Sequence, residues 1–244
     1  MSVLVKMETF VYKNIVVHMQ GNQTFKFVDD YYKKGDRVLD FGCGVGSNST
    51  LFHHDDYIGV EVDESRVLSS RLKYPINKFE KIPFISTLND KIPFGDNSFD
   101  IIFISLCLHH IDSDTCKLLF KEFSRLLNEN GKIIGVEPCV LSKKYFSNVI
   151  MNVIDAGDYI LPIEEYKQIY SSEAFDVEDV NIVKTAGYHL WQYSAKPNGN
   201  EVSKYTGSMT NYRYLIRPIH LVLLYGKWVA LLFLFYLIIN QIVN

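Results

Sequence analysis

The feature that most constrains this chain is a short apolar run that ends in three glycines, each two residues from the next. Residues 37–46 read Arg-Val-Leu-Asp-Phe-Gly-Cys-Gly-Val-Gly. Glycine has no Cβ, so it adopts positive φ angles and lets another molecule approach the backbone closely. The run therefore predicts a buried strand of an α/β fold, followed by a loop that binds a ligand at the carboxyl end of the sheet.

Two acidic residues support a nucleotide-like ligand. Asp40 stands near the end of the first apolar run, and Glu61 stands 21 positions later in a second one. In doubly wound folds, an acid about 20 residues after the glycine strand accepts hydrogen bonds from a ribose. The glycine spacing distinguishes two classes of cofactor. A loop that binds a dinucleotide reads G-x-G-x-x-G, whereas the third glycine of this chain, Gly46, comes one residue earlier than that pattern requires. An oxidoreductase with a nicotinamide cofactor stays an alternative at this point.

Three further blocks follow in order along the chain. Ile-Pro-Phe-Gly-Asp-Asn-Ser-Phe-Asp occupies residues 92–100, Leu-His-His-Ile occupies 108–111, and a pattern of helix, turn and strand covers 123–134. Together with the glycine loop, these blocks resemble the class I S-adenosylmethionine-dependent methyltransferases of the small-molecule, methyltransferase-11-like type. The resemblance covers roughly residues 20–195 and is densest before Glu137.

The resemblance implies a fold and a cofactor. The fold is α/β, a doubly wound and mostly parallel Rossmann-like sheet of seven strands with one antiparallel strand. The cofactor is S-adenosylmethionine, whose methionine part lies in the glycine loop. The residues assigned to it are Asp40, Gly42, Cys43, Gly44 and Gly46 in the loop, Glu61 on the ribose hydroxyls, and Ser105 beside the sulfonium.

The expected adenine site departs from the family pattern. Family members often carry an acid before the Leu-Pro-Phe block, and that acid reaches the adenine amino group. Here Leu88 stands at the corresponding position. We therefore expect the backbone of Leu88 and Asn89 to contact the adenine instead.

The candidate catalytic residues are His109 and His110, which follow the expected fourth strand. A histidine with a pKa near neutrality can take a proton from a hydroxyl as the methyl group moves. This favours an oxygen acceptor on a small-molecule or lipid-linked substrate. Alternatively, one histidine packs against the next helix, or alignment of donor and acceptor suffices without a base. Glu137, at the end of the fifth strand, faces the same crevice.

Composition narrows the possible partners. The net charge is −3, from 25 basic and 28 acidic residues, and no clustered basic face indicates nucleic-acid binding. The first nine residues lack the pattern of a signal peptide. No C-x-x-C spacing indicates a metal site, and the cysteines are typical of reduced thiols in a cytoplasmic protein. They are Cys43, Cys107, Cys116 and Cys139.

The chain divides into three parts by composition. We expect a methyltransferase domain at residues 1–195, a polar linker at 196–211 and a hydrophobic helical tail at 212–244. Within the tail, residues 219–239 are long enough and mostly apolar enough to span a bilayer, although Lys227 lies near their middle. The tail either attaches the protein to a membrane or packs within protein as a docked helix or dimer interface. A membrane-associated protein that binds the cofactor without catalysis is a further alternative, and the oligomeric state is not predicted.

Local patterns predict the order of the elements. A helix ends at Lys33-Lys34-Gly35, and further helices are expected at 63–74, 112–131, 142–155 and 162–170. The expected strands lie at 37–41, 57–63, 78–85, 99–105 and 132–136, with a final hairpin at 175–194.

Overall fold

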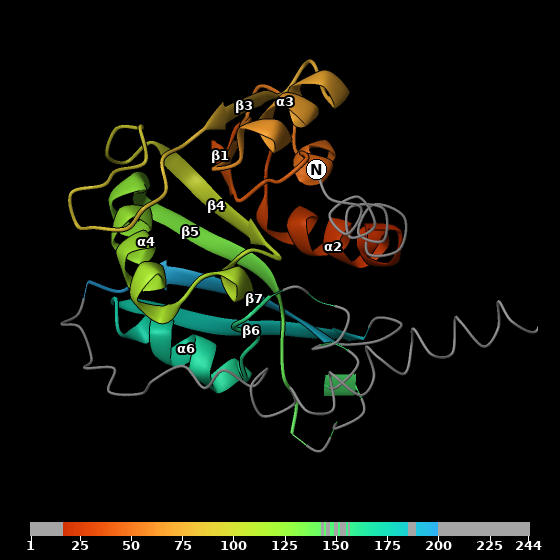
Figure 1. The fold of residues 1–244 in the computed structure, drawn as a ribbon, viewed down its shortest axis with the longest axis vertical. Helices are drawn as coiled ribbons and strands as arrows, with labels where there is room; N and C mark the ends of the chain where they lie inside the picture. Colours follow the sequence, from red (N-terminus) through yellow and green to blue (C-terminus); the bar gives the residue numbers. More distant parts are fainter. Residues whose placement is uncertain are drawn as a thin grey trace, which may run out of the picture.

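A seven-stranded sheet forms the centre of the molecule in the computed structural model (Figure 1). The structure describes residues 17–199, apart from 143, 145–146, 149–150, 152–154, 156 and 185–188. The strands lie in the order β3-β2-β1-β4-β5-β7-β6. Their bounds are β1 Val38–Phe41, β2 Tyr57–Glu61, β3 Lys78–Lys81, β4 Phe99–Ser105, β5 Leu127–Pro138, β6 Phe175–Lys184 and β7 His189–Pro197.

The sheet is parallel except for one strand. The pairings β1–β2, β1–β4, β2–β3 and β4–β5 are parallel, whereas β7 runs antiparallel to both β5 and β6. This confirms the fold predicted from the sequence. The strand order reverses at β1, which lies between β2 and β4, so the carboxyl ends of β1 and β4 border the crevice where doubly wound folds bind ligands.

Helices cover both faces of the sheet (Figure 1). Side chains of α4 and α6 share one core cluster with Leu39 and Phe41, and those of α2 and α3 share the other with Val38. This alternation follows from the two-residue period of a strand. The helix bounds are α2 Val17–Tyr31, α3 Glu64–Lys73, α4 Ser113–Leu126 and α6 Ile163–Ser171, with short 3-10 turns η2 Ser47–Leu51 and η3 Leu108–His110.

Two aspartates fix where α3 and α4 begin. The Asp63 carboxylate accepts the backbone N–H groups of Ser65 and Arg66. The Asp112 carboxylate accepts those of Asp114 and Thr115. Such caps satisfy N–H groups that have no partner within the helix. The helix starts predicted from the sequence are therefore confirmed.

The largest differences from the predicted strand bounds lie in β5 and β3. Strand β5 begins at Leu127 rather than at residue 132, because buried Leu127 already has an extended backbone and pairs with Phe99 before a register shift. The helix predicted at 112–131 therefore ends early, at Leu126, and residues 127–131 belong to the strand. Strand β3 ends at Lys81, since Pro83 lacks the N–H group that a longer ladder needs.

Several predictions fall on residues that the structure does not describe. The hydrophobic tail, most of the linker, the turn of the final hairpin and much of the helix expected at 142–155 belong to this group. Strand β7 ends at Pro197, two residues beyond the predicted domain boundary. Among the described residues, the structure contains no helix with the length and apolarity needed to span a bilayer.

Candidate active site

The glycine loop after β1 has two packed glycines and one open glycine. Gly42, Gly44 and Gly46 all have positive φ angles, of 70°, 55° and 76°. A Cβ on Gly42 would lie 2.3 Å from the Cys107 Sγ, and one on Gly46 would lie 2.7 Å from the Phe79 ring. A Cβ on Gly44 would have no described atom within 4 Å. The outer two glycines therefore let the loop pack tightly, while Gly44 offers open backbone that a ligand can approach.

Asp40 carries an unsatisfied oxygen beneath this loop. Its side chain is buried, and its Oδ2 accepts the Tyr57 hydroxyl at 2.7 Å. Its Oδ1 has no hydrogen-bond partner among the described residues. Burial raises the pKa of Asp40 to about 7, against the lowering effect of the Tyr57 hydrogen bond. A buried unpaired acceptor is costly, so Asp40 fits a bound molecule that donates a hydrogen bond, such as the ammonium group of S-adenosylmethionine.

Glu61 holds the glycine loop in shape at the end of β2. Its Oε2 accepts the Gly44 N–H at 3.1 Å. Its Oε1 accepts the N–H groups of Val62 at 2.8 Å and Asp63 at 3.1 Å. A carboxylate can accept about four hydrogen bonds, so capacity for a ribose hydroxyl remains. The sequence indicated the ribose role for Glu61 but not this contact with Gly44.

The loop after β4 approaches the glycine loop from the other side of the crevice. Ser105 is buried at the end of β4, and Leu106 follows with a φ of 54°. A non-glycine residue in this conformation is uncommon and points to a local structural demand. The Leu106 N–H donates to the Val136 carbonyl at 2.9 Å, and Cys107 then packs against Gly42. Ser105 therefore lies two residues before the Cys107 side chain that packs against the glycine loop, and its expected place beside the sulfonium stays a prediction.

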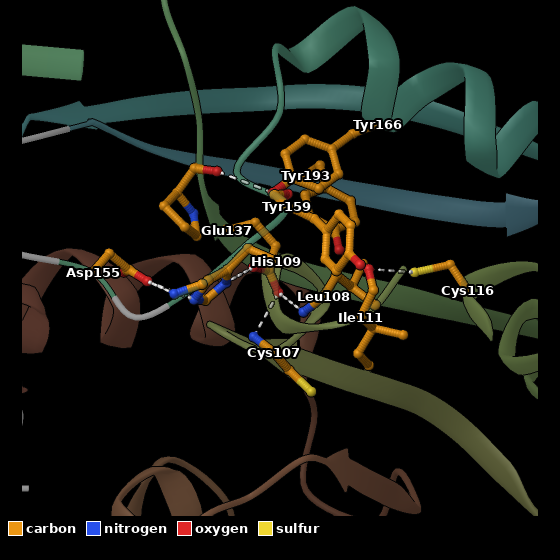
Figure 2. A network of polar contacts seen from close by, with 12 residues as sticks. Cys107, Leu108, His109, Ile111, Cys116, Glu137, Asp155, Tyr159, Tyr166 and Tyr193 are labelled. Atoms are coloured by element: carbon orange, nitrogen blue, oxygen red, sulfur yellow. Dashed lines mark hydrogen bonds and ion pairs between the residues drawn. The ribbon is translucent and has the colours of Figure 1, made fainter. Parts of the chain in front are cut away.

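Behind this loop, a buried histidine joins two carboxylates (Figure 2). The His109 Nδ1 lies 2.7 Å from the Glu137 Oε2, and the His109 Nε2 lies 3.2 Å from the Asp155 Oδ1. The Glu137 Oε1 also accepts the N–H groups of Cys107 and Leu108, both at 2.8 Å. Glu137 thus fixes both the histidine and the backbone that follows β4.

The charges in this network fix the protonation of His109. Burial opposes the imidazolium form, but Asp155 and Glu137 outweigh burial and raise the pKa of His109 to about 10. Burial likewise opposes the Asp155 carboxylate, but the His109 charge lowers the pKa of Asp155 to about 2. At neutral pH, His109 is therefore a cation with both ring nitrogens engaged. A general base needs a free nitrogen and a pKa near the working pH, so the geometry does not suit His109 for that role.

His110 differs from its neighbour in exposure and charge. His110 is the more exposed of the two residues, although its ring packs against the His109 ring with 4.1 Å between the centroids. Loss of water around the packed ring, followed by the His109 charge, lowers the pKa of His110 to about 4. His110 is therefore neutral at pH 7 and a weak base.

The expected adenine contacts lie on the exposed loop after β3. The Leu88 side chain is 70% exposed, and Asn89 is exposed beside it. The Asp90 Oδ2 holds this loop by accepting the N–H groups of Ser86 and Thr87 at 2.9 and 2.7 Å. The loop starts at the carboxyl end of β3, on the edge of the sheet that carries Glu61. An adenine contact from Leu88 and Asn89 stays a prediction.

Comparison with known proteins places the domain in a family. Residues 39–135 match the family model described as "Methyltransferase domain". Phosphoethanolamine N-methyltransferase 3 of Arabidopsis thaliana is 25% identical over 157 residues, covering 63% of this chain and 31% of that protein. Malonyl-[acyl-carrier protein] O-methyltransferase of Legionella pneumophila is 29% identical over 99 residues, covering 39% and 34%. The chain thus spans about a third of the length of these two curated relatives.

A solved structure shows the same fold. The SAM-dependent methyltransferase from Aquifex aeolicus superposes with a TM-score of 0.53 and 18% sequence identity, covering 77% of this chain and 97% of that one. Residues 39–135 are therefore a class I S-adenosylmethionine-dependent methyltransferase domain, with S-adenosylmethionine as its cofactor. This confirms the family and the cofactor predicted from the sequence. The alternative, an oxidoreductase with a nicotinamide cofactor, is therefore set aside.

Proposed function

We propose that this protein transfers a methyl group from S-adenosylmethionine to a small-molecule or lipid-linked acceptor. The observation that carries the proposal is the wall of the crevice between β1 and β4. Asp40 near the end of β1 has an unpaired oxygen, and Gly44 in the following loop has open space beside its backbone and donates its N–H to Glu61 at the end of β2. A ligand with a hydrogen-bond donor at one end and a ribose at the other would supply hydrogen-bond partners for Asp40 and Glu61.

In the proposed reaction, the residues of this chain hold the two reactants in place and do not transfer a proton. When bound, the cofactor supplies an electrophilic methyl group on a sulfonium. The loop from Ser105 to Leu108, fixed by Glu137, holds the acceptor side of the crevice next to the glycine loop. Holding a nucleophile in line with the methyl group supplies most of what such a displacement needs.

The two histidines after β4 bear on the acceptor atom. An oxygen acceptor was predicted because a histidine base would follow β4, yet both nitrogens of His109 are engaged and His110 is a weak base. We therefore propose an acceptor that carries an available lone pair at neutral pH, so that no strong base is required. The two curated relatives carry the names of an N-methyltransferase and an O-methyltransferase, which is compatible with either atom in this chain.

A lipid-linked acceptor and a cytoplasmic, membrane-attached location are proposed from the sequence alone. The apolar run at 219–239 supports them, and it lies outside the described residues.

Product analysis tests the proposed activity. We expect the full chain, incubated with S-adenosylmethionine and a cell extract that includes membranes, to produce S-adenosylhomocysteine. A compound whose mass has risen by one methylene should appear in parallel. At a concentration of S-adenosylmethionine near the wild-type dissociation constant, Glu61→Gln should strongly lower both signals if Glu61 belongs to the site. Cofactor binding without either product would favour the non-catalytic alternative.

A further inference from the structure

Between β5 and α6, the chain returns past the loop that follows β4. We refer to Asp155 and residues 157–161 as the strap. Asp155 contacts the His109 Nε2 through its Oδ1 and accepts the Gly157 N–H on the same oxygen at 2.7 Å. The Tyr159 N–H donates to the His109 carbonyl at 2.9 Å. His109 therefore binds the strap through both its ring and its backbone.

The far end of the strap is attached to the chain just after β5. The Val140 N–H donates to the Leu161 carbonyl at 3.0 Å, and Val140 also forms an isolated parallel bridge with Pro162. The Tyr166 hydroxyl donates to the carbonyls of Pro138 at 3.2 Å and Tyr159 at 3.4 Å. These contacts place the strap beside the carboxyl ends of β4 and β5, which is the edge of the sheet where ligands bind.

Close packing adds to these bonds at Gly157. A Cβ at this position would lie 2.1 Å from the His109 Cδ2 and 2.9 Å from the His109 carbonyl oxygen. Only glycine therefore lets the strap lie directly on the imidazole ring. The contact is independent of charge, so it provides a second way to test the attachment.

The charges explain why the attachment is specific. Figure 2 shows His109 between Asp155 from the strap and Glu137 from β5. Removing one partner of a buried ion pair leaves the remaining charge uncompensated, which is strongly unfavourable. Glu137 also binds the backbone N–H groups after β4, so the contacts run without a break from the strap to the loop that carries Ser105.

We propose that Asp155 is a positioning residue that, through His109, fastens the strap beside the carboxyl ends of β4 and β5, where the strap forms a wall of the acceptor pocket. The meaning of this wall rests on the proposed methyl transfer. The fastening itself can be measured without turnover.

Two variants of the full chain test the fastening by different means. Asp155→Asn removes one carboxylate, and Gly157→Ala crowds the His109 ring while keeping every charge. Asp114→Asn is the matched control, because Asp114 is exposed on α4 and pairs with Lys117 on the same helix. Amide hydrogen exchange reports on the strap, and nuclear magnetic resonance of the His109 ring nitrogens reports on its protonation.

We expect both variants to accelerate exchange at the strap amides by about tenfold or more, while the amides of β1 and β4 keep their rates. In Asp155→Asn, the His109 ring should lose its proton at a lower pH than in the wild type, because Glu137 is then the remaining carboxylate beside it and His110 contributes no negative charge. The dissociation constant for S-adenosylmethionine should stay within about threefold, since the glycine loop is untouched.

Three results would overturn the inference. Strap amides and His109 signals that match the wild type in both variants would mean that the contacts do not fasten the strap. Equal acceleration in the strap, β1 and β4 would mean that Asp155 stabilises the whole fold instead. The same effects in Asp114→Asn would show that they do not depend on the contact with His109. If the wild type fails to bind S-adenosylmethionine, the proposed function is wrong. The hydrogen-exchange result would still show whether Asp155 fastens the strap.

Discussion

At the scale of single residues, the buried Asp40 carboxyl offers a test of the proposed cofactor site that needs no ligand. A buried carboxylate with one oxygen unpaired is energetically unfavourable. The folded-state pKa of Asp40 is about 7, above its ordinary value of 3.8, so the folded protein holds this proton more tightly than the unfolded chain does. Stability from this group is present below about pH 4 and is lost as the pH rises to about 7.

The corresponding experiment compares the wild type with Asp40→Asn by urea unfolding at several pH values. The variant has no carboxyl group to titrate, so the stability of the wild type relative to it should fall by up to about 4 kcal/mol between pH 4 and pH 8. If the free energies of unfolding of the two proteins change with pH in parallel, Asp40 is already ionised in the folded state. That result would contradict the raised pKa of Asp40.

His110 provides a second test at this scale. With a pKa lowered to about 4, it is a poor acceptor for the proton of a hydroxyl group. We expect His110→Ala to keep turnover within about threefold of the wild type in the product assay. A loss of about 10²–10⁴-fold with intact cofactor binding would instead establish His110 as a general base.

At the scale of elements, the glycine loop offers a matched pair of substitutions. Gly46→Ala adds both a strained positive φ and a clash with the Phe79 ring, so it should lower the free energy of unfolding by about 2–5 kcal/mol. Gly44→Ala adds only the backbone strain, about 1–2 kcal/mol, but its Cβ would occupy the space open to the ligand.

Urea unfolding and calorimetric titration separate the two effects of this pair. Gly44→Ala should stay folded and lose affinity for S-adenosylmethionine, whereas Gly46→Ala should mainly lose stability. Unchanged affinity in Gly44→Ala would mean that the ligand does not approach the loop at this glycine.

The elements also show what the sequence could predict. The bounds of β4 agree with the prediction because its buried run is continuous and ends at a polar residue, Ser105. The start of β5 was missed, since Leu127 pairs with Phe99, a residue distant in the sequence, and no local pattern marks that pairing. Asp155 was missed for a similar reason, because its partner His109 is distant in the sequence and no motif marks the segment between β5 and α6. The paired carboxylates that raise the pKa of His109 depend on the same tertiary contacts.

At the scale of the whole molecule, all seven strands of the part of the chain that the structure describes lie before residue 198. Strand β7 ends at Pro197, and the Asn198 N–H donates to the Ala174 carbonyl at 2.9 Å. We therefore expect a chain that ends at Gly199 to fold, to remain in solution and to bind S-adenosylmethionine, while the full chain sediments with membranes. Aggregation of the shortened chain would indicate that the apolar run packs against the domain. A full chain that stays in the supernatant without detergent would contradict membrane attachment.

The most direct test of the central claim is calorimetric titration of the full chain with S-adenosylmethionine, S-adenosylhomocysteine and NAD. We predict binding of the first two and none of NAD. Glu61→Gln should raise the dissociation constant for S-adenosylmethionine by about 10–100-fold, because one carboxylate oxygen that accepts N–H groups becomes a donor. Glu64→Gln, the same change at an exposed position on α3, should leave it unchanged. Binding of NAD without S-adenosylmethionine, or equal affinity in the Glu61 and Glu64 variants, would contradict the account.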